Sequence, residues 1–210
     1  ICVGPLLEDG EWREARALIE EPLASIGYRF ESPDLVTLIL SQTNYYPSLI
    51  QLYCSQLLDN VSDPVRAAFD LRNIPPYWIT AKHVNDAYQN PALRHSVRQR
   101  FDLTLQLDRR YEVMALAVAY NSLATEGHAI VDGFSASWLR EEAMYWWPEG
   151  FKDSSTYDAI RALADEMVGL GVLRHVSPGT YALRSPNVLL LMGDQDNILR
   201  QLDRKREIPI

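Results

Sequence analysis

The stretch SSTYDAIRALADEMVGLGVLRHVSPGTYALR, residues 154–184, decides the fold of the second half of the chain. Its first part carries apolar side chains at helical spacing, which predicts a helix over residues 154–169. Those apolar positions are Tyr157, Ile160, Leu163, Ala164 and Met167. A β-prone run at 171–176, a Ser-Pro-Gly turn at 177–179 and a second run at 181–184 then predict a β-hairpin.

Two further helices are expected before this stretch. Residues 110–124 are apolar on most faces, which predicts a buried helix. Ser135 or Ser137 is a suitable N-cap for a helix that extends to about Tyr145. Three helices followed by a hairpin is the element order of a winged-helix domain, which we place at residues 108–185.

The rest of the chain is also expected to be helical. Helix starts such as Ser32-Pro33-Asp34, together with apolar stripes, predict a helical bundle over residues 5–107. Pro22 is expected to kink or divide the first helix of this bundle, because proline lacks an N–H. A polar, proline-bearing connection is expected at 59–78, and C-terminal helices are expected over residues 186–210. The predicted fold class is therefore mainly α.

The composition is that of an ordinary globular protein, with 210 residues, 47% of them hydrophobic and 23% charged. The chain holds 20 Lys plus Arg against 28 Asp plus Glu, a formal net charge of −8. This balance weighs against a general nucleic-acid binder, because phosphate binding needs concentrated basic residues. No apolar run approaches the roughly 20 residues that span a bilayer, so no membrane partner is expected. Cys2 and Cys54 make no disulfide framework, which predicts a cytoplasmic location.

The sequence lacks the motifs of common enzymes. It contains neither a Walker-type phosphate loop nor a Gly-x-Gly-x-x-Gly turn, and the Gly-x-Ser-x-Gly elbow is missing too. The four histidines lie far apart, and pairs of acidic residues are adjacent in the sequence, so that their side chains diverge on a helix. We therefore assign no catalytic residue and no metal ligand.

A winged helix raises the alternative of DNA binding. The predicted third helix, which would enter the major groove, carries three acidic side chains (Asp158, Asp165 and Glu166) against a single arginine. The hairpin adds a modest basic patch, with Arg174 and Arg184 as candidate DNA contacts. This charge pattern disfavours DNA as the partner.

Aromatic residues gather in and just after the helix predicted at 135–145. In one interpretation Trp138, Trp146 and Trp147 pack in the core. In the other they form an exposed surface for a protein partner, since Trp and Tyr dominate interface hot spots. The sequence leaves both interpretations open.

Two segments resemble a known family. Residues 1–6 (ICVGPL) and 43–52 (TNYYPSLIQL) are similar to the C-terminal portion of bacterial STAND-class P-loop ATPases, within the AAA+ superfamily. In that family a core strand ends in a Gly-Pro-Leu-like turn, passes into a helical lid and is followed by a winged helix. The resemblance implies that residues 1–4 end such a strand. It agrees with our interpretation that a chain beginning at Ile1, inside a strand-like run, is a piece of a longer protein.

The resemblance also implies where nucleotide binds. The family's lid proline packs beside the bound nucleotide, and the matching residue is Pro47, with Tyr46 and Asn44 next to it. The family's phosphate loop and magnesium-binding acids precede the lid. We therefore expect no cofactor in this chain alone, and ATP or ADP with Mg²⁺ in the intact ATPase. No Arg lies close to Pro47 in the sequence, so we assign no second-sensor arginine.

The implied function is regulatory. The lid and winged helix would close on nucleotide in the intact protein and relay the nucleotide state to protein partners, with the upstream NTPase core of the same chain as the first partner. The alternatives are a DNA-binding transcriptional regulator and a protein-interaction module, because one fold can serve several functions.

Overall fold

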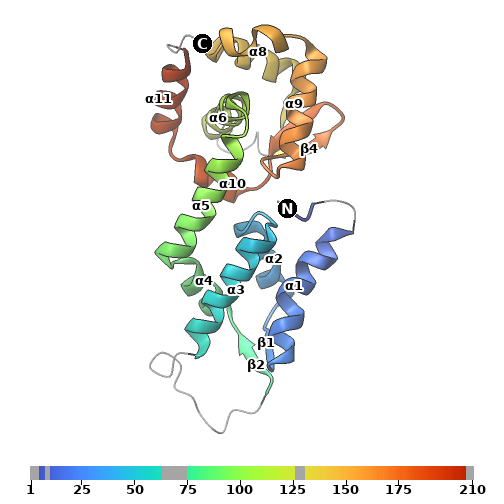
Figure 1. Cartoon of the computed structure of the whole chain (residues 1–210), viewed down its shortest axis with the longest axis vertical. Helices are drawn as coiled ribbons and strands as arrows, with labels where there is room; N and C mark the ends of the chain where they lie inside the picture. The colour runs from blue at the N-terminus through green and yellow to red at the C-terminus, as the bar shows by residue number, and fades with distance from the viewer. Residues whose placement is uncertain (1–4, 8–9, 63–74, 126–130, 207–210) are drawn as a thin grey trace. The chain divides into compact units, whose positions relative to one another are not determined.

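The computed structural model describes residues 5–7, 10–62, 75–125 and 131–206 (Figure 1). This part of the chain is mainly helical with a few short strands, as the sequence predicts. It divides into two compact units, unit 1 over Ile1–Arg100 and unit 2 over Phe101–Ile210. The strand predicted at residues 1–4 lies outside the described residues.

Unit 1 is built from helices that pack around α3. Its helices are α1 (Glu11–Ser25), α2 (Pro33–Gln42), α3 (Pro47–Ser62), α4 (Ala81–Tyr88) and the first part of α5 (Pro91–Leu105). α3 contacts α1, α2 and α4, and α1 also contacts α2. The fully buried apolar side chains of the first three helices include Ile19, Ile39, Ile50 and Leu57.

Two helices of unit 1 begin at side-chain caps. The Ser32 hydroxyl accepts a hydrogen bond from the Asp34 N–H at the start of α2, where Pro33 occupies the first helical position. At α4 the Thr80 hydroxyl accepts from the His83 N–H, and His83 Nδ1 accepts from the Thr80 N–H. This reciprocal pair is a capping box, which gives His83 a structural role.

Two details of unit 1 differ from the sequence predictions. Of the two effects predicted for Pro22, a kink or a division of the helix, the division does not occur, because α1 continues through Pro22. Pro22 lies on the exposed side while Leu23 is buried, so packing holds the last turn despite the missing N–H. The connection predicted at 59–78 ends in a strand, β2 (Tyr77–Ile79), which pairs in parallel with β1 (Tyr28–Phe30). Strands of three residues are too short to show a clear period of two, so neither strand was predicted from the sequence.

Tyr53 connects three helices of unit 1. Its ring on α3 is fully buried, and its hydroxyl lies 2.8 Å from Gln42 Oε1 at the end of α2 and 2.8 Å from the Val84 carbonyl oxygen on α4. A phenol has one proton, so the two acceptors share it or the Gln42 amide turns its NH2 toward the phenol oxygen. Burial raises the pKa of Tyr53 above its usual value. The neutral phenol therefore anchors the end of α2.

Unit 2 combines helices with a small antiparallel sheet. After the end of α5 its elements are α6 (Arg109–Ala124), β3 (Phe134–Ser135), α8 (Ala136–Trp146), a 3-10 helix (Glu149–Ser154), α9 (Tyr157–Gly169), β4 (Leu173–Ser177), β5 (Thr180–Leu183), α10 (Pro186–Met192) and α11 (Gln195–Arg206). The strand order is β3-β5-β4, and both pairs are antiparallel. Ser135 caps α8 and Ser185 caps α10, in agreement with the helix starts read from the sequence.

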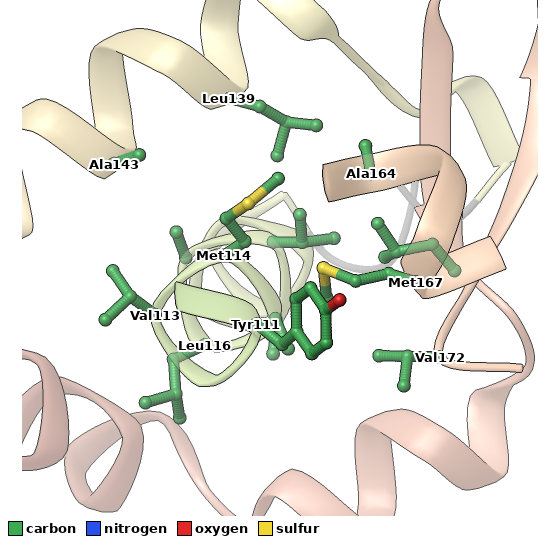
Figure 2. Packing of buried hydrophobic residues seen from close by; sticks show 14 of the residues in the cluster. Tyr111, Val113, Met114, Leu116, Leu139, Ala143, Ala164, Met167 and Val172 are labelled. Carbon is green, nitrogen blue, oxygen red and sulfur yellow. The ribbon is translucent and has the colours of Figure 1, made fainter. Parts of the chain in front are cut away.

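Helix α6 forms the centre of the unit 2 core, and it is buried on most of its faces, as its sequence predicts (Figure 2). Tyr111 and Met114 extend from α6 into this core. Leu139 of α8 and Met167 of α9 approach α6 from different sides (Figure 2). α11 also contacts α6, so helices that are distant in the sequence share one core.

The third helix of unit 2 begins later than predicted. α9 starts at Tyr157, after a Thr156 hydroxyl that accepts from the Ala159 N–H. Tyr157 was expected on the buried face, but its side chain is 43% exposed. It occupies the first position of α9, beyond the end of the face that packs on the core.

Candidate functional site

The turn between α2 and α3, residues 43–47, contains the three residues that the family resemblance singles out. Its backbone has two consecutive left-handed residues, Asn44 with φ 49° and Tyr45 with φ 61°. Asn adopts this conformation more readily than Tyr, whose Cβ crowds the neighbouring backbone. Strain of this kind persists only where surrounding contacts impose it, and it is concentrated at functional sites.

Backbone hydrogen bonds hold this turn. The Tyr45 N–H donates to the Leu40 carbonyl at 3.1 Å, across the end of α2. The Tyr46 N–H donates to the Thr43 carbonyl at 3.1 Å. The Leu6 N–H donates to the Tyr45 carbonyl at 3.0 Å, which ties the beginning of the described chain to the turn. The left-handed conformation is therefore fixed by contacts on both sides.

The three predicted site residues, which are close neighbours in the sequence, lie in this turn and differ in burial. Asn44 and Tyr46 are buried, at 6% and 5% exposure, and Pro47 is half-buried at the first position of α3. The Leu49 and Ile50 N–H groups both donate to the Tyr46 carbonyl, at 3.0 and 2.9 Å. Since proline has a fixed φ that suits the first helical position, its ring is held rigidly at the entrance to α3.

Arg100 of α5 lies beside the same turn. Its Cζ is 4.9 Å from the centroid of the Tyr46 ring, a distance at which the guanidinium is attracted by the ring face. Arg100 was not predicted as a neighbour of this turn, because Arg100 and Tyr46 are far apart in the chain. The one available signal is that Arg100 lies between Val97 and Phe101, at the edge of the apolar stripe of α5.

The aromatic cluster around the end of α8 belongs mostly to the core. Trp146 and Trp147 are only 6% and 8% exposed, and the Trp147 ring meets the ring of Phe151 edge-on at 6.2 Å. The interpretation of an exposed partner surface is therefore wrong for these two residues, because neighbouring elements cover them. Trp138 is half-buried and stacks on Phe134, with ring centroids 4.0 Å apart.

The two arginines predicted as DNA contacts lie at the open end of the β4–β5 pair. Arg174 on β4 is in register with Ala182 on β5. The Arg184 N–H donates to the Val172 carbonyl at 3.0 Å. Both arginine side chains are half-buried, which limits the basic surface that the hairpin offers.

The acids of α9 accept hydrogen bonds from phenols of the core. The Tyr181 hydroxyl donates to Asp165 Oδ1 at 2.6 Å, and the Tyr111 hydroxyl donates to Glu166 Oε2 at 2.5 Å. Burial, followed by these carboxylates, raises the pKa of Tyr111 to about 12 and raises that of Tyr181 as well. His175 Nε2 lies 3.5 Å from the same oxygen of Asp165. These contacts attach the two acidic side chains of α9 to the core of unit 2.

The described part of the chain contains no group of three or more His, Cys, Asp or Glu side chains placed to bind a metal ion. None of the helices in that part is both long and apolar enough to cross a membrane. Comparisons with protein families, curated proteins and solved structures find no match to this chain. The candidate site rests on the geometry of the 43–47 turn.

Proposed function

We propose that this chain is the regulatory lid and winged-helix region of a STAND-class signalling ATPase, which closes on nucleotide bound by an NTPase core of the same protein. The observation that carries the proposal is the strained turn at 43–47, which holds Asn44, Tyr46 and Pro47 together where α3 begins. In this proposal the core binds ATP or ADP with Mg²⁺, and Pro47, which is half-buried, packs against the nucleotide, while the buried Asn44 and Tyr46 hold the turn in place.

The chemistry of the turn suits this role. The rigid ring of Pro47 offers apolar surface with little conformational entropy to lose, which favours packing against a base. α3 begins at the same residue, and the N-terminal end of a helix carries partial positive charge that favours a nearby phosphate. The turn is already fixed by hydrogen bonds, so nucleotide binding does not have to order it.

The topology of unit 2 supports the second half of the proposal. In the described residues the helices α6, α8 and α9 precede the hairpin β4–β5, and the short strand β3, which was not predicted, pairs with β5; this order supports the winged-helix part of the proposal. We assign this domain the task of passing the nucleotide state to a protein partner. Such a relay requires two arrangements whose balance depends on nucleotide.

DNA binding remains the alternative for unit 2, and the acidic α9 disfavours it. Asp165 and Glu166 lie on the exposed side of the helix that would enter the major groove. A gel-shift assay at low salt distinguishes the two functions. Tight, salt-sensitive binding to duplex DNA that is lost on charge reversal at Arg174 and Arg184 would favour the alternative.

The proposed site is tested by substitution of Pro47 in the protein that joins this chain to its NTPase core. Pro47→Ala is expected to weaken ADP binding by about tenfold, the effect of losing roughly 1.4 kcal/mol of contact free energy. Pro33→Ala is the matched control, because Pro33 occupies the first position of α2 in the same unit and is exposed. Isothermal titration calorimetry with ADP measures both variants.

The outcome is decisive once both variants show the circular dichroism of the parent protein. A weaker ADP affinity in Pro47→Ala together with an unchanged affinity in Pro33→Ala supports the contact. Equal ADP affinities in the parent protein and in both variants would refute the assignment of the turn as the nucleotide contact.

A further inference from the structure

Resting on the proposed function, we infer that Arg100 is a positioning residue that carries the state of the 43–47 turn into unit 2. Its guanidinium lies over the ring of Tyr46, the direct neighbour of Pro47. Arg100 is also the residue that immediately precedes Phe101, with which unit 2 begins. The contact with Tyr46 therefore connects the candidate site to the helix that enters the second unit.

The contact between Arg100 and Tyr46 is largely shielded from water. Tyr46 is 5% exposed and Arg100 is half-buried. A cation over an aromatic face is held more strongly when the pair is desolvated. A guanidinium also stacks on the ring through its planar face, so Lys is only a partial replacement. A displacement of the Tyr46 ring therefore acts directly on Arg100.

Helix α5 supplies the path from this contact to unit 2. It is continuous from Pro91 to Leu105. Phe101 and Leu105, in its last turns, belong to the buried core cluster of unit 2. A helix transmits displacement along its axis, and a packed core shifts between discrete arrangements. In this inference a displacement of Arg100 therefore changes the packing of Phe101 and Leu105.

The mechanism follows from these two connections. A nucleotide that packs on Pro47 changes the position available to the adjoining Tyr46 ring. If the protein binds nucleotide more tightly with one placement of that ring, nucleotide shifts the equilibrium between the conformations of Arg100 and α5. The size of this shift equals the difference in nucleotide-binding free energy between the two placements. Arg100 acts through Tyr46, so its own contribution to nucleotide affinity is small.

Amide hydrogen exchange tests the inference in the protein that joins this chain to its NTPase core, with and without ADP. In the parent protein ADP is expected to slow exchange at residues 44–50 and to change it at residues 101–105. Arg100→Gln is expected to keep the slowing at 44–50, with ADP affinity within about fivefold of the parent, and to lose the change at 101–105. Arg100→Lys is expected to restore part of that change, because it keeps the charge.

Two further variants complete the design. Arg94→Gln removes an equal charge from an exposed position of α5 and is expected to behave as the parent protein. Arg100→Met keeps an apolar stem and replaces Arg100→Gln if the latter does not fold.

Each outcome has a defined meaning. Persistence of the ADP-dependent change at 101–105 after the loss of the charge at Arg100 overturns the relay. The same holds if the parent protein is protected at 44–50 without any change at 101–105. Absence of protection at 44–50 in the parent protein contradicts the proposed function itself, so the two failures are distinguishable.

Discussion

Replacement of Tyr53 by Phe is expected to destabilise unit 1 by about 2 kcal/mol. The ring is fully buried and keeps its volume, so the change removes only the hydroxyl. That hydroxyl makes two contacts of 2.8 Å, with Gln42 Oε1 and with the Val84 carbonyl. The single phenol proton contributes about 1 kcal/mol net as a hydrogen-bond donor, and roughly 1 kcal/mol more is lost because both former partners stay largely buried without their phenol. The loss of the anchor at Gln42 also loosens the adjoining 43–47 turn.

The pH dependence provides an independent check on Tyr53. Burial raises the pKa of Tyr53 in the folded protein above its ordinary value of 10.0. The folded state therefore keeps this proton after the unfolded state has released it, and the associated stability, complete below about pH 10, is lost as the pH rises further. Tyr53→Phe carries no such proton, so its stability is expected to fall less steeply in alkali.

The assay follows unit 1 separately from unit 2. The 210-residue chain is equilibrated in increasing urea, and a short pulse of amide exchange is read by mass spectrometry on peptides from α2 and α3. Tyr28→Phe is the matched control, because its ring is half-buried in the same unit and the described residues provide no hydrogen bond to its hydroxyl. A loss below about 0.5 kcal/mol for Tyr53→Phe, or an equal loss in both variants, would refute the reasoning.

Two further predictions concern unit 2. Gly150→Ala is expected to destabilise it by about 1–3 kcal/mol, because an added Cβ would lie 2.1 Å from the Trp147 ring. Gly169→Ala, where nothing lies within 4 Å, is expected to maintain or raise stability, and equal melting temperatures for the two variants would contradict this packing. The pKa of Tyr111 is raised from its ordinary value of 10.0 to about 12 in the folded protein. Unit 2 is therefore expected to lose stability as the pH rises from about 10 to about 12, because the unfolded chain releases this proton first. Urea midpoints at stepped pH should decline less in Glu166→Gln, which removes one cause of the raised pKa; an identical decline would exclude this cause.

Most helix starts could be predicted from the sequence because a cap is a local interaction. The Ser32 and Thr80 hydroxyls each accept from a backbone N–H two or three residues further along the chain. Of the two N-caps predicted for the helix at 135–145, Ser135 is the one that caps α8, and Ser185 caps α10 in the same way. A side chain, a φ angle and an N–H within one turn decide these positions, so no knowledge of the fold is required.

The candidate site was predictable only in part. The family resemblance marks Asn44, Tyr46 and Pro47, but nothing in the sequence reveals that Arg100 packs on Tyr46 or that Tyr53 anchors the end of α2. These contacts join positions on different helices, and they arise from tertiary packing. The same limit explains why the sequence left two interpretations open at Trp146, because a tryptophan-rich helix end suits either a core or an interface until its neighbours are known.

The acidic side chains of α9 disfavour DNA binding only if their hydrogen bonds do not offset their negative charge. Counting charges disfavours DNA, yet a carboxylate that accepts a hydrogen bond could be regarded as neutralised. The donors to Asp165 and Glu166 are phenols, which are neutral near pH 7, so these hydrogen bonds add no positive charge to the face of α9. Arg161 Nε approaches Asp165 only at 3.7 Å, with both side chains about half exposed, and such pairs contribute little. The repulsion toward phosphate therefore persists, and it is the physical reason why we propose a protein rather than DNA as the partner of unit 2.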